Sequence, residues 1–146
     1  MRAQISLTVS ESKKIIAKGI AALPIVRKAL RSGRIFLKGG TTVSAVCEEI
    51  TGKRMLIAGR VSPQGTKMAQ DYSGQYHCAL FEKGKLLAVD NILEQTLKNL
   101  HRDDVVIIGA NIIDAFGHAA MMYGVALGGK PGRIISGLMY ETKNVI

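Results

Sequence analysis

The residues best suited to chemistry lie at positions 38–42, which read Lys-Gly-Gly-Thr-Thr. The apolar run 35–37 before them predicts a buried strand, and Val43, Val46 and Ile50 follow them at helical spacing. The pattern predicts a strand, a glycine turn and a helix N-terminus, where backbone N–H groups and the helix dipole favour negative charge. We expect a phosphate or carboxylate to be held there by Lys38, Gly39, Gly40, Thr41 and Thr42. Glycine and threonine at such a turn also serve chain reversal and capping alone, and this alternative stays open.

A second group of polar residues follows the most strand-like run of the chain, residues 105–108. Gly109 ends this run, and Asn111, Asp114 and His118 come after it. In a parallel sheet this stretch lies at the same edge as the glycine turn. Asp114 can hydrogen-bond a sugar hydroxyl or act as a base, and His118 can titrate near neutral pH. The same residue types also stabilise turns and helix starts, so a purely structural role is the alternative.

Elsewhere, the pattern predicts helices that alternate with strands. A capping box of Thr8 with Glu11 begins a helical lead, in which Pro24 starts a second helix. Further strands are expected at 55–61 and 133–138, a β-hairpin at 78–81 and 86–89, and helices after an Asn91 cap and at 119–127. Asp103 and Asp104 are interpreted as solvated loop residues. Residues 62–77 are expected to be a mobile loop that serves as a lid, an assembly surface or a disordered excursion.

This alternation predicts an α/β fold: a three-layer, mainly parallel, Rossmann-like sheet with helices on both faces and an inserted β-hairpin. The 146 residues are expected to form one domain, with a helical lead at 1–33 and the sheet with its helices at 34–146. The two cysteines and three histidines show no metal-ligand spacing, so no metal and no cofactor is expected. Because no apolar run could span a bilayer and no signal-peptide core is evident, we expect a cytoplasmic protein with no membrane partner.

The formal net charge of +9 is concentrated in residues 1–40, which hold nine Lys or Arg and a single acid, Glu11. No aromatic residue precedes Phe36, so stacking on single-stranded nucleic acid is unsupported. We interpret the basic residues as a solvated helix face rather than a nucleic-acid surface. The charge also gives the chain a bias towards anionic small molecules.

Over residues 10–138, the order of elements resembles the superfamily that contains ribose-5-phosphate isomerase, glucosamine-6-phosphate deaminase and CoA transferases. The deoxyribose-repressor-type sugar-sensing domains and the initiation factor 2B-like proteins belong to it as well. The resemblance implies that the turn at 39–42 binds a ligand phosphate and that Gly109, Ala110 and Asn111 approach the same ligand. Asn111 stands where the family has an acidic residue, and the glutamate-bearing segment of ribose-5-phosphate isomerase has no counterpart here.

The first interpretation is a domain that binds a phosphorylated small molecule, in which Asn111 and Asp114 orient the part of the ligand beyond the anion. The alternative is an isomerase- or hydrolase-type enzyme on a phosphosugar or nucleotide-like substrate. Asp114 or His118 would then be the acid–base group, and Lys38 or Arg60 would stabilise negative charge. A third interpretation is a non-catalytic assembly or regulatory subunit. Because the chain is compact for this superfamily, we expect a homo-oligomer.

Overall fold

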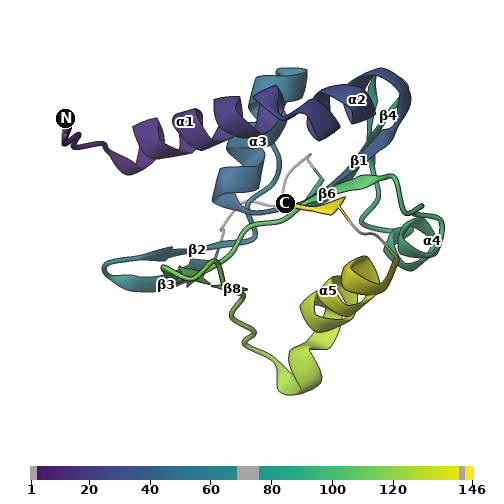
Figure 1. Ribbon diagram of the computed structural model, residues 1–146. Helices are drawn as coiled ribbons and strands as arrows, with labels where there is room; N and C mark the ends of the chain where they lie inside the picture. Colours follow the sequence, from purple (N-terminus) through teal and green to yellow (C-terminus); the bar gives the residue numbers. More distant parts are fainter. Residues whose placement is uncertain (1–2, 69–75, 142–143) are drawn as a thin grey trace.

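The computed structural model describes residues 3–68, 76–141 and 144–146, which have a mixed α/β fold around a five-stranded sheet (Figure 1). Its strands are β5 (Lys85–Ala88), β4 (Cys78–Glu82), β1 (Arg34–Lys38), β6 (Val105–Ile107) and β9 (Asn144–Val145), in that spatial order. β1, β6 and β9 are parallel, whereas β4 is antiparallel to β1 and β5 is antiparallel to β4. The α/β prediction is therefore confirmed, and so is the hairpin, although its first strand pairs directly with β1. The three-layer, mainly parallel, Rossmann-like arrangement stays a prediction.

Three helices from the first third of the chain pack over one face of the sheet. They are α1 (Val9–Ala22), α2 (Pro24–Ser32) and α3 (Thr41–Thr51). Ile35 and Leu37 of β1 share one buried cluster with Val26 of α2 and Val43 of α3, and α1 packs on α3. Successive side chains of a strand point to opposite faces, so Ile35 and Leu37 belong to this cluster, whereas Phe36 between them points to the opposite face of the sheet.

The opposite face of the sheet carries α4 (Leu93–Lys98) and α5 (Gly129–Glu141). Phe36 of β1 and Val106 of β6 belong to a second buried cluster with Leu97 of α4 and Leu138 of α5. Because β1 is covered on both faces, it reads as a continuous apolar run instead of an alternating one. Burial on both sides makes this strand a rigid support for the residues that follow it.

Local sequence signals define several helix ends. The Glu11 N–H donates to the Thr8 hydroxyl at 3.3 Å, and the Thr8 N–H donates to the Glu11 carboxylate at 2.8 Å, which confirms the capping box. Pro24 is the first residue of α2, and Gly52 ends α3 with a φ of 71°. At that φ glycine is favoured because it has no Cβ.

The prediction of a buried strand at 55–61 is wrong. Residues 53–58 are not in a regular element, and β2 (Gly59–Ser62) pairs with β3 (Gly65–Met68) as a separate exposed hairpin. Pro63 and Gly65 set the turn, and the alternation of apolar and polar residues in β2 cannot fill a core. Part of the loop expected at 62–77 is therefore a strand, and residues 69–75 lie outside the described part.

Two predictions near the C-terminus are also wrong. The stretch 119–127 is not a helix: β8 (Ala119–Ala120) pairs with β7 (Ile112–Ile113), and extended chain then leads to the 3-10 helix η1 (Ala126–Gly128). Residues 133–138 are helical within α5 and not a strand. Ile134 and Leu138 are buried at a spacing of four, which is the period of a helix, although so short an apolar run fits either structure.

Two polar residues have roles that differ from those predicted. Asn91 does not cap α4, which begins at Leu93 without any side-chain cap. Asp104 is not solvated, because its buried carboxylate pairs with Arg34 across the sheet. The sequence around Asp104 predicts a solvated loop, because Arg34 lies 70 positions away and is brought to Asp104 only by the tertiary fold.

None of the described helices could cross a bilayer. The longest of them, α1, has 14 residues, whereas a membrane-spanning helix needs about 20 predominantly apolar ones.

Candidate functional site

The turn between β1 and α3 is built on a close backbone approach. The Gly39 N–H donates to the carbonyl oxygen of His77 at 2.7 Å. A Cβ added to Gly39 would lie 2.2 Å from that oxygen, so a side chain there would force the two segments apart. Gly40, in contrast, would meet nothing within 4 Å, so its surroundings are open. Gly39 is therefore needed for packing, and Gly40 leaves space in front of the helix.

The N-terminus of α3 faces this open space without a side-chain cap. The first N–H groups of any α-helix have no partner within the helix, and they carry its partial positive charge. The Thr41 and Thr42 side chains are half-buried here. Neither hydroxyl has a hydrogen bond within the described part of the chain. Donors are therefore gathered at one point without an acceptor.

Lys38, the last residue of β1, adds a buried cation beside this helix end. The residue is only 8% exposed, and among the described residues its ammonium has neither a hydrogen bond nor an ion pair. Burial lowers the pKa of Lys38, and the neighbouring Cys78, its partner in the β1–β4 register, acts in the opposite direction. Burying an unpaired charge is costly, so this lysine is not explained by folding stability.

A cavity of about 230 Å³ connects these features. It is lined by Lys38, Gly39, Gly40, Thr41, Thr42, Gly59, Arg60, Val61, Gly109, Ala110, Asn111, Met121, Met122 and Pro131. Every residue predicted to bind ligand is among them except Asp114. The pairing of Leu37 with Ile107 explains the convergence, because β1 and β6 are parallel neighbours that end at the same edge.

The charge of the lining is positive. Lys38 and Arg60 contribute two cations, and none of the described residues in the lining is acidic. Arg60 lies on the exposed strand β2 and makes no ion pair with the described residues. The Asn111 Oδ1 atom accepts a hydrogen bond from the Met122 N–H at 3.0 Å, which leaves its amide NH₂ group as a donor. The cavity therefore offers donors and positive charge at one end and neutral groups at the other.

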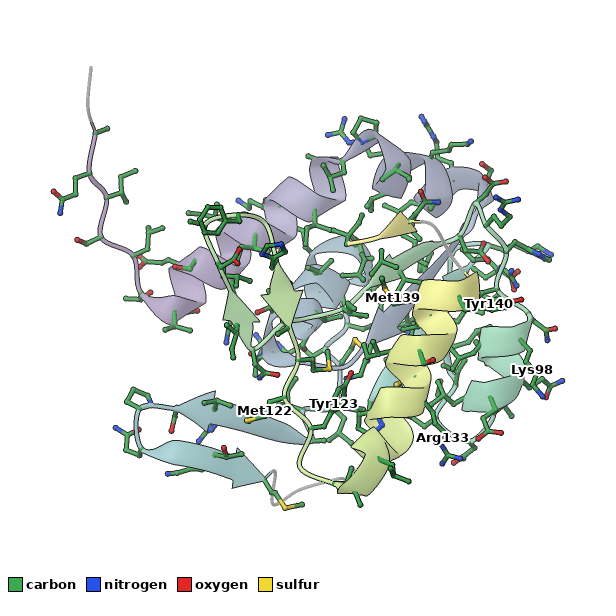
Figure 2. The ribbon with its side chains drawn as sticks, turned by 60° about the horizontal axis from the view of Figure 1, so that its bottom comes forward. Lys98, Met122, Tyr123, Arg133, Met139 and Tyr140 are labelled. Atoms are coloured by element: carbon green, nitrogen blue, oxygen red, sulfur yellow. The ribbon has the colours of Figure 1, made fainter. Side chains whose placement is uncertain are left out.

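The sequence prediction missed part of this lining. Met121, Met122 and Pro131 come from the stretch between β8 and the first turn of α5, and Gly59 and Val61 come from β2. Figure 2 shows Met122 and Tyr123 on this stretch. No local signal marks these residues as site residues. The sequence predicts a helix at 119–127, which includes Met121 and Met122, and a buried strand at 55–61, which ends at Val61.

Asp114 and His118 are brought together with each other but not with the cavity. The Asp114 Oδ2 atom lies 2.7 Å from the His118 Nδ1 atom, and Asp114 Oδ1 accepts from the N–H groups of Phe116 and His118 at 2.8 and 2.9 Å. These bonds, the one to the His118 ring first, lower the pKa of Asp114. The carboxylate closes the turn of the exposed β7–β8 hairpin, as Asp commonly does in loops.

Two other hollows each contain a carboxylate that has a partner. One of about 580 Å³ contains Asp90, whose carboxylate accepts from the N–H groups of His77 and Cys78, both at 2.9 Å. One of about 400 Å³ lies between α4 and α5, where Glu94 and Arg133 approach to 3.7 Å at an apolar floor. Within the described residues, no group of three or more His, Cys, Asp or Glu could hold a metal ion.

Comparison of the chain with protein-family models, with curated proteins and with solved structures gives no match. The function must therefore be argued from the geometry and charge of the site.

Proposed function

We propose that this protein binds a small anionic molecule, a phosphorylated metabolite, in the cavity between β1, α3 and β2. The observation that carries the proposal is Lys38, a buried lysine that has no partner among the described residues and lines the same cavity as the uncapped N-terminus of α3. An anion placed there would accept hydrogen bonds from backbone N–H groups and threonine hydroxyls, and it would form an ion pair with the lysine. It would also compensate the charge that folding buries.

The size of the cavity favours a small ligand. Its volume of about 230 Å³ is below the range of roughly 300–1,000 Å³ that is usual for drug-sized ligands. A phosphate with a short neutral chain or a single sugar fits this volume better than a dinucleotide or a CoA ester. The Asn111 amide and the Met121–Met122 segment border the neutral part of such a ligand.

The resemblance to the sugar-phosphate superfamily, with its three-layer, mainly parallel, Rossmann-like sheet, forms part of this proposal. Two arrangements support it: a glycine turn between β1 and α3, and the residues after β6 at the same edge of the sheet. Binding is favoured over turnover because the described residues that line the cavity include no carboxylate and no imidazole. An acid–base role of Asp114 and His118 stays a prediction.

The test is a thermal-shift and NMR titration with inorganic phosphate, phosphosugars, nucleotides and CoA esters. A ligand at about one hundred times its Kd should stabilise the fold by roughly 2.7 kcal/mol. The Thr41→Val, Thr42→Val double variant should weaken binding without abolishing it, because backbone donors remain. Asp114→Asn, outside the cavity, is the matched control and should bind normally.

Two outcomes would change the conclusion. No shift with any anion, or amide shifts remote from residues 38–42, would refute the anion site. Turnover of a phosphosugar that is lost in Asp114→Asn would instead support the alternative of an isomerase- or hydrolase-type enzyme in which Asp114 is the acid–base group.

We also propose that the chain forms a homo-oligomer. The observation that favours it is the exposed apolar β7–β8 hairpin, in which Ile113 is 79% and Phe116 is 87% exposed. An isolated two-stranded hairpin is marginally stable in water unless a further strand or helix covers its apolar face. A second copy of the chain would supply that cover.

A further inference from the structure

The Lys38 side chain combines three properties that are seldom found together in a structural lysine. It lies two residues after Phe36 on β1, so both side chains point to the face that α4 and α5 cover. It is more than nine-tenths buried, it has no hydrogen-bond or ion-pair partner in the described part of the chain, and it lines a cavity. Anion binding uses its charge but leaves its nucleophilicity unexplained.

We propose that Lys38 captures the carbonyl carbon of a small anionic aldehyde or ketone as an imine. The inference rests on the anion site proposed above, and it specifies the ligand class of that site. The anionic group would sit at the N–H groups of α3 with Thr41 and Arg60, while the carbonyl end reaches the Nζ atom. A cavity of about 230 Å³ keeps the two ends of the ligand within a few bonds of each other.

The chemistry balances without any further reactant. The lone pair of the neutral amine attacks the carbonyl carbon, and after one proton passes from nitrogen to oxygen a carbinolamine results. The carbinolamine then loses its hydroxyl group with one proton as water while the C=N double bond forms. The carbonyl oxygen thus leaves as water, and nothing is oxidised or reduced. The imine nitrogen then takes up one proton from solvent, equal to the proton that the ammonium released before the attack, so the protonated imine carries one positive charge and the site remains complementary to the anion.

The surroundings of Lys38 favour this step over the same step at other lysines. The neutral amine is the nucleophile, and burial lowers the pKa of Lys38, so more of it is neutral at a given pH. Among the described residues that line the cavity, there is no carboxylate to hold the ammonium form. The absence of a carboxylate also removes the obvious base for onward chemistry, so the expected result is reversible capture.

Reductive trapping tests the proposal with the full chain. The protein is incubated with glycolaldehyde phosphate, a small phosphorylated aldehyde, and sodium cyanoborohydride at neutral pH, and labelled lysines are identified by peptide mass spectrometry. Lys38 should be labelled several-fold faster than Lys67, because burial lowers the pKa of Lys38 and leaves more of its amine neutral. Lys67, on the exposed strand β3, is the internal reference. Excess glycerol phosphate, which has the anion but no carbonyl, should suppress labelling of Lys38 several-fold and leave Lys67 unchanged.

Lys38→Arg separates this inference from the anion site. Arginine keeps the positive charge but is not a nucleophile at neutral pH. The variant should still be stabilised by glycerol phosphate, and its adduct at position 38 should be lost. Labelling of Lys38 in the wild type that is no faster than at Lys67, or that glycerol phosphate does not suppress, would overturn the imine. These wild-type results decide the question even where the variant does not fold.

The two proposals fail in different ways. Stabilisation by glycerol phosphate without selective labelling of Lys38 would leave the anion site and overturn the imine alone. No response to glycerol phosphate together with unselective labelling would overturn both.

Discussion

Lys38 carries a free-energy cost of folding, because it is a buried cation without a partner among the described residues. Burial lowers the pKa of Lys38 in the folded protein, whereas the unfolded chain keeps the ordinary value. Between these two pKa values the unfolded state binds more protons. The free energy of unfolding therefore rises with pH between the two pKa values, and the cost of the buried charge is fully present below the folded-state pKa.

Replacing the charge should make the protein more stable and less able to bind. We expect Lys38→Met to raise the free energy of unfolding at pH 7 by about 1–2 kcal/mol, since an apolar chain avoids the desolvation of an ammonium. The same variant should lose phosphate binding. Urea unfolding and phosphate titration measure the two effects, with Lys67→Met on exposed β3 as the control for a lost surface charge. A destabilised Lys38→Met that still binds phosphate would contradict the assigned role.

Anion affinity should depend on pH through the same group. A bound anion stabilises the ammonium form and raises the pKa of Lys38, so binding is strongest below the free-protein value and weakens as pH rises through it. Sulfate is the suitable probe because it does not itself titrate in this range. Calorimetry over an alkaline pH series should show falling affinity in the wild type and a flat profile in Lys38→Arg. An equally steep profile in both proteins would assign the titration to another group.

The sequence predicts which residues come together at the site, but it does not predict how deeply they are buried or with which charges they pair. Lys38 and Thr41 are close in the chain and are positioned by local structure, so their proximity can be inferred from the strand–turn–helix pattern. Met122 and Pro131, which line the cavity together with Lys38, are distant from it in sequence. The pairing of Asp104 with Arg34 likewise joins residues 70 positions apart.

Among the elements, β1 and β6 are joined at the edge opposite to the cavity by a buried ion pair. Arg34 begins β1, and its guanidinium contacts both Asp104 carboxylate oxygens, at 2.5 and 3.2 Å. Asp104 also accepts from the His101 N–H at 2.6 Å, and the Arg34 Nη2 atom that contacts Asp104 donates to the Asn99 carbonyl oxygen as well, at 2.6 Å. The network fixes the register of the two parallel strands whose other ends carry the site.

Breaking this ion pair should destabilise the fold without altering the site. Asp104→Ala leaves the Arg34 charge buried and unpaired, so we expect a loss of about 3–5 kcal/mol in the free energy of unfolding. Asp103→Ala, at the exposed neighbouring residue, should change it little. Chemical unfolding measures the loss, and phosphate affinity of the folded fraction should stay unchanged. A loss below about 1 kcal/mol would mean that solvent compensates the arginine.

The elements that the sequence predicts correctly are those whose signal is local. The capping box of Thr8, the proline that starts α2 and the glycine that ends α3 each depend on a few neighbouring residues. The predictions at 55–61 and 133–138 fail because a short apolar run fits a strand or a helix equally well. Only packing decides between them: Ile134 is buried against α4, whereas Val61 has no core to join.

Across the whole molecule, positive charge is unevenly distributed along the chain. Residues 1–40 hold nine Lys or Arg and one acid, and they form α1, α2 and β1. Residues 105–129 contain no Lys or Arg and one acid, Asp114, yet they expose Ile112, Ile113 and Phe116. Two copies that met through the helices would bring like charges together, whereas contact through the hairpin would not. The hairpin is therefore the surface on which self-association is favoured.

Phe116 is expected to be the central contact of this self-association, because large aromatic side chains dominate interface energies. Phe116→Asp should weaken the oligomer by at least about 2 kcal/mol, roughly thirtyfold in Kd, and shift the chain to a monomer at micromolar concentration. Size-exclusion chromatography with light scattering measures the mass over a dilution series. Ile5→Asp, at an equally exposed apolar residue before α1, is the matched control and should keep the wild-type mass. A wild type that is monomeric throughout the series would refute the homo-oligomer, and an oligomer unaffected by Phe116→Asp would place the interface on another surface.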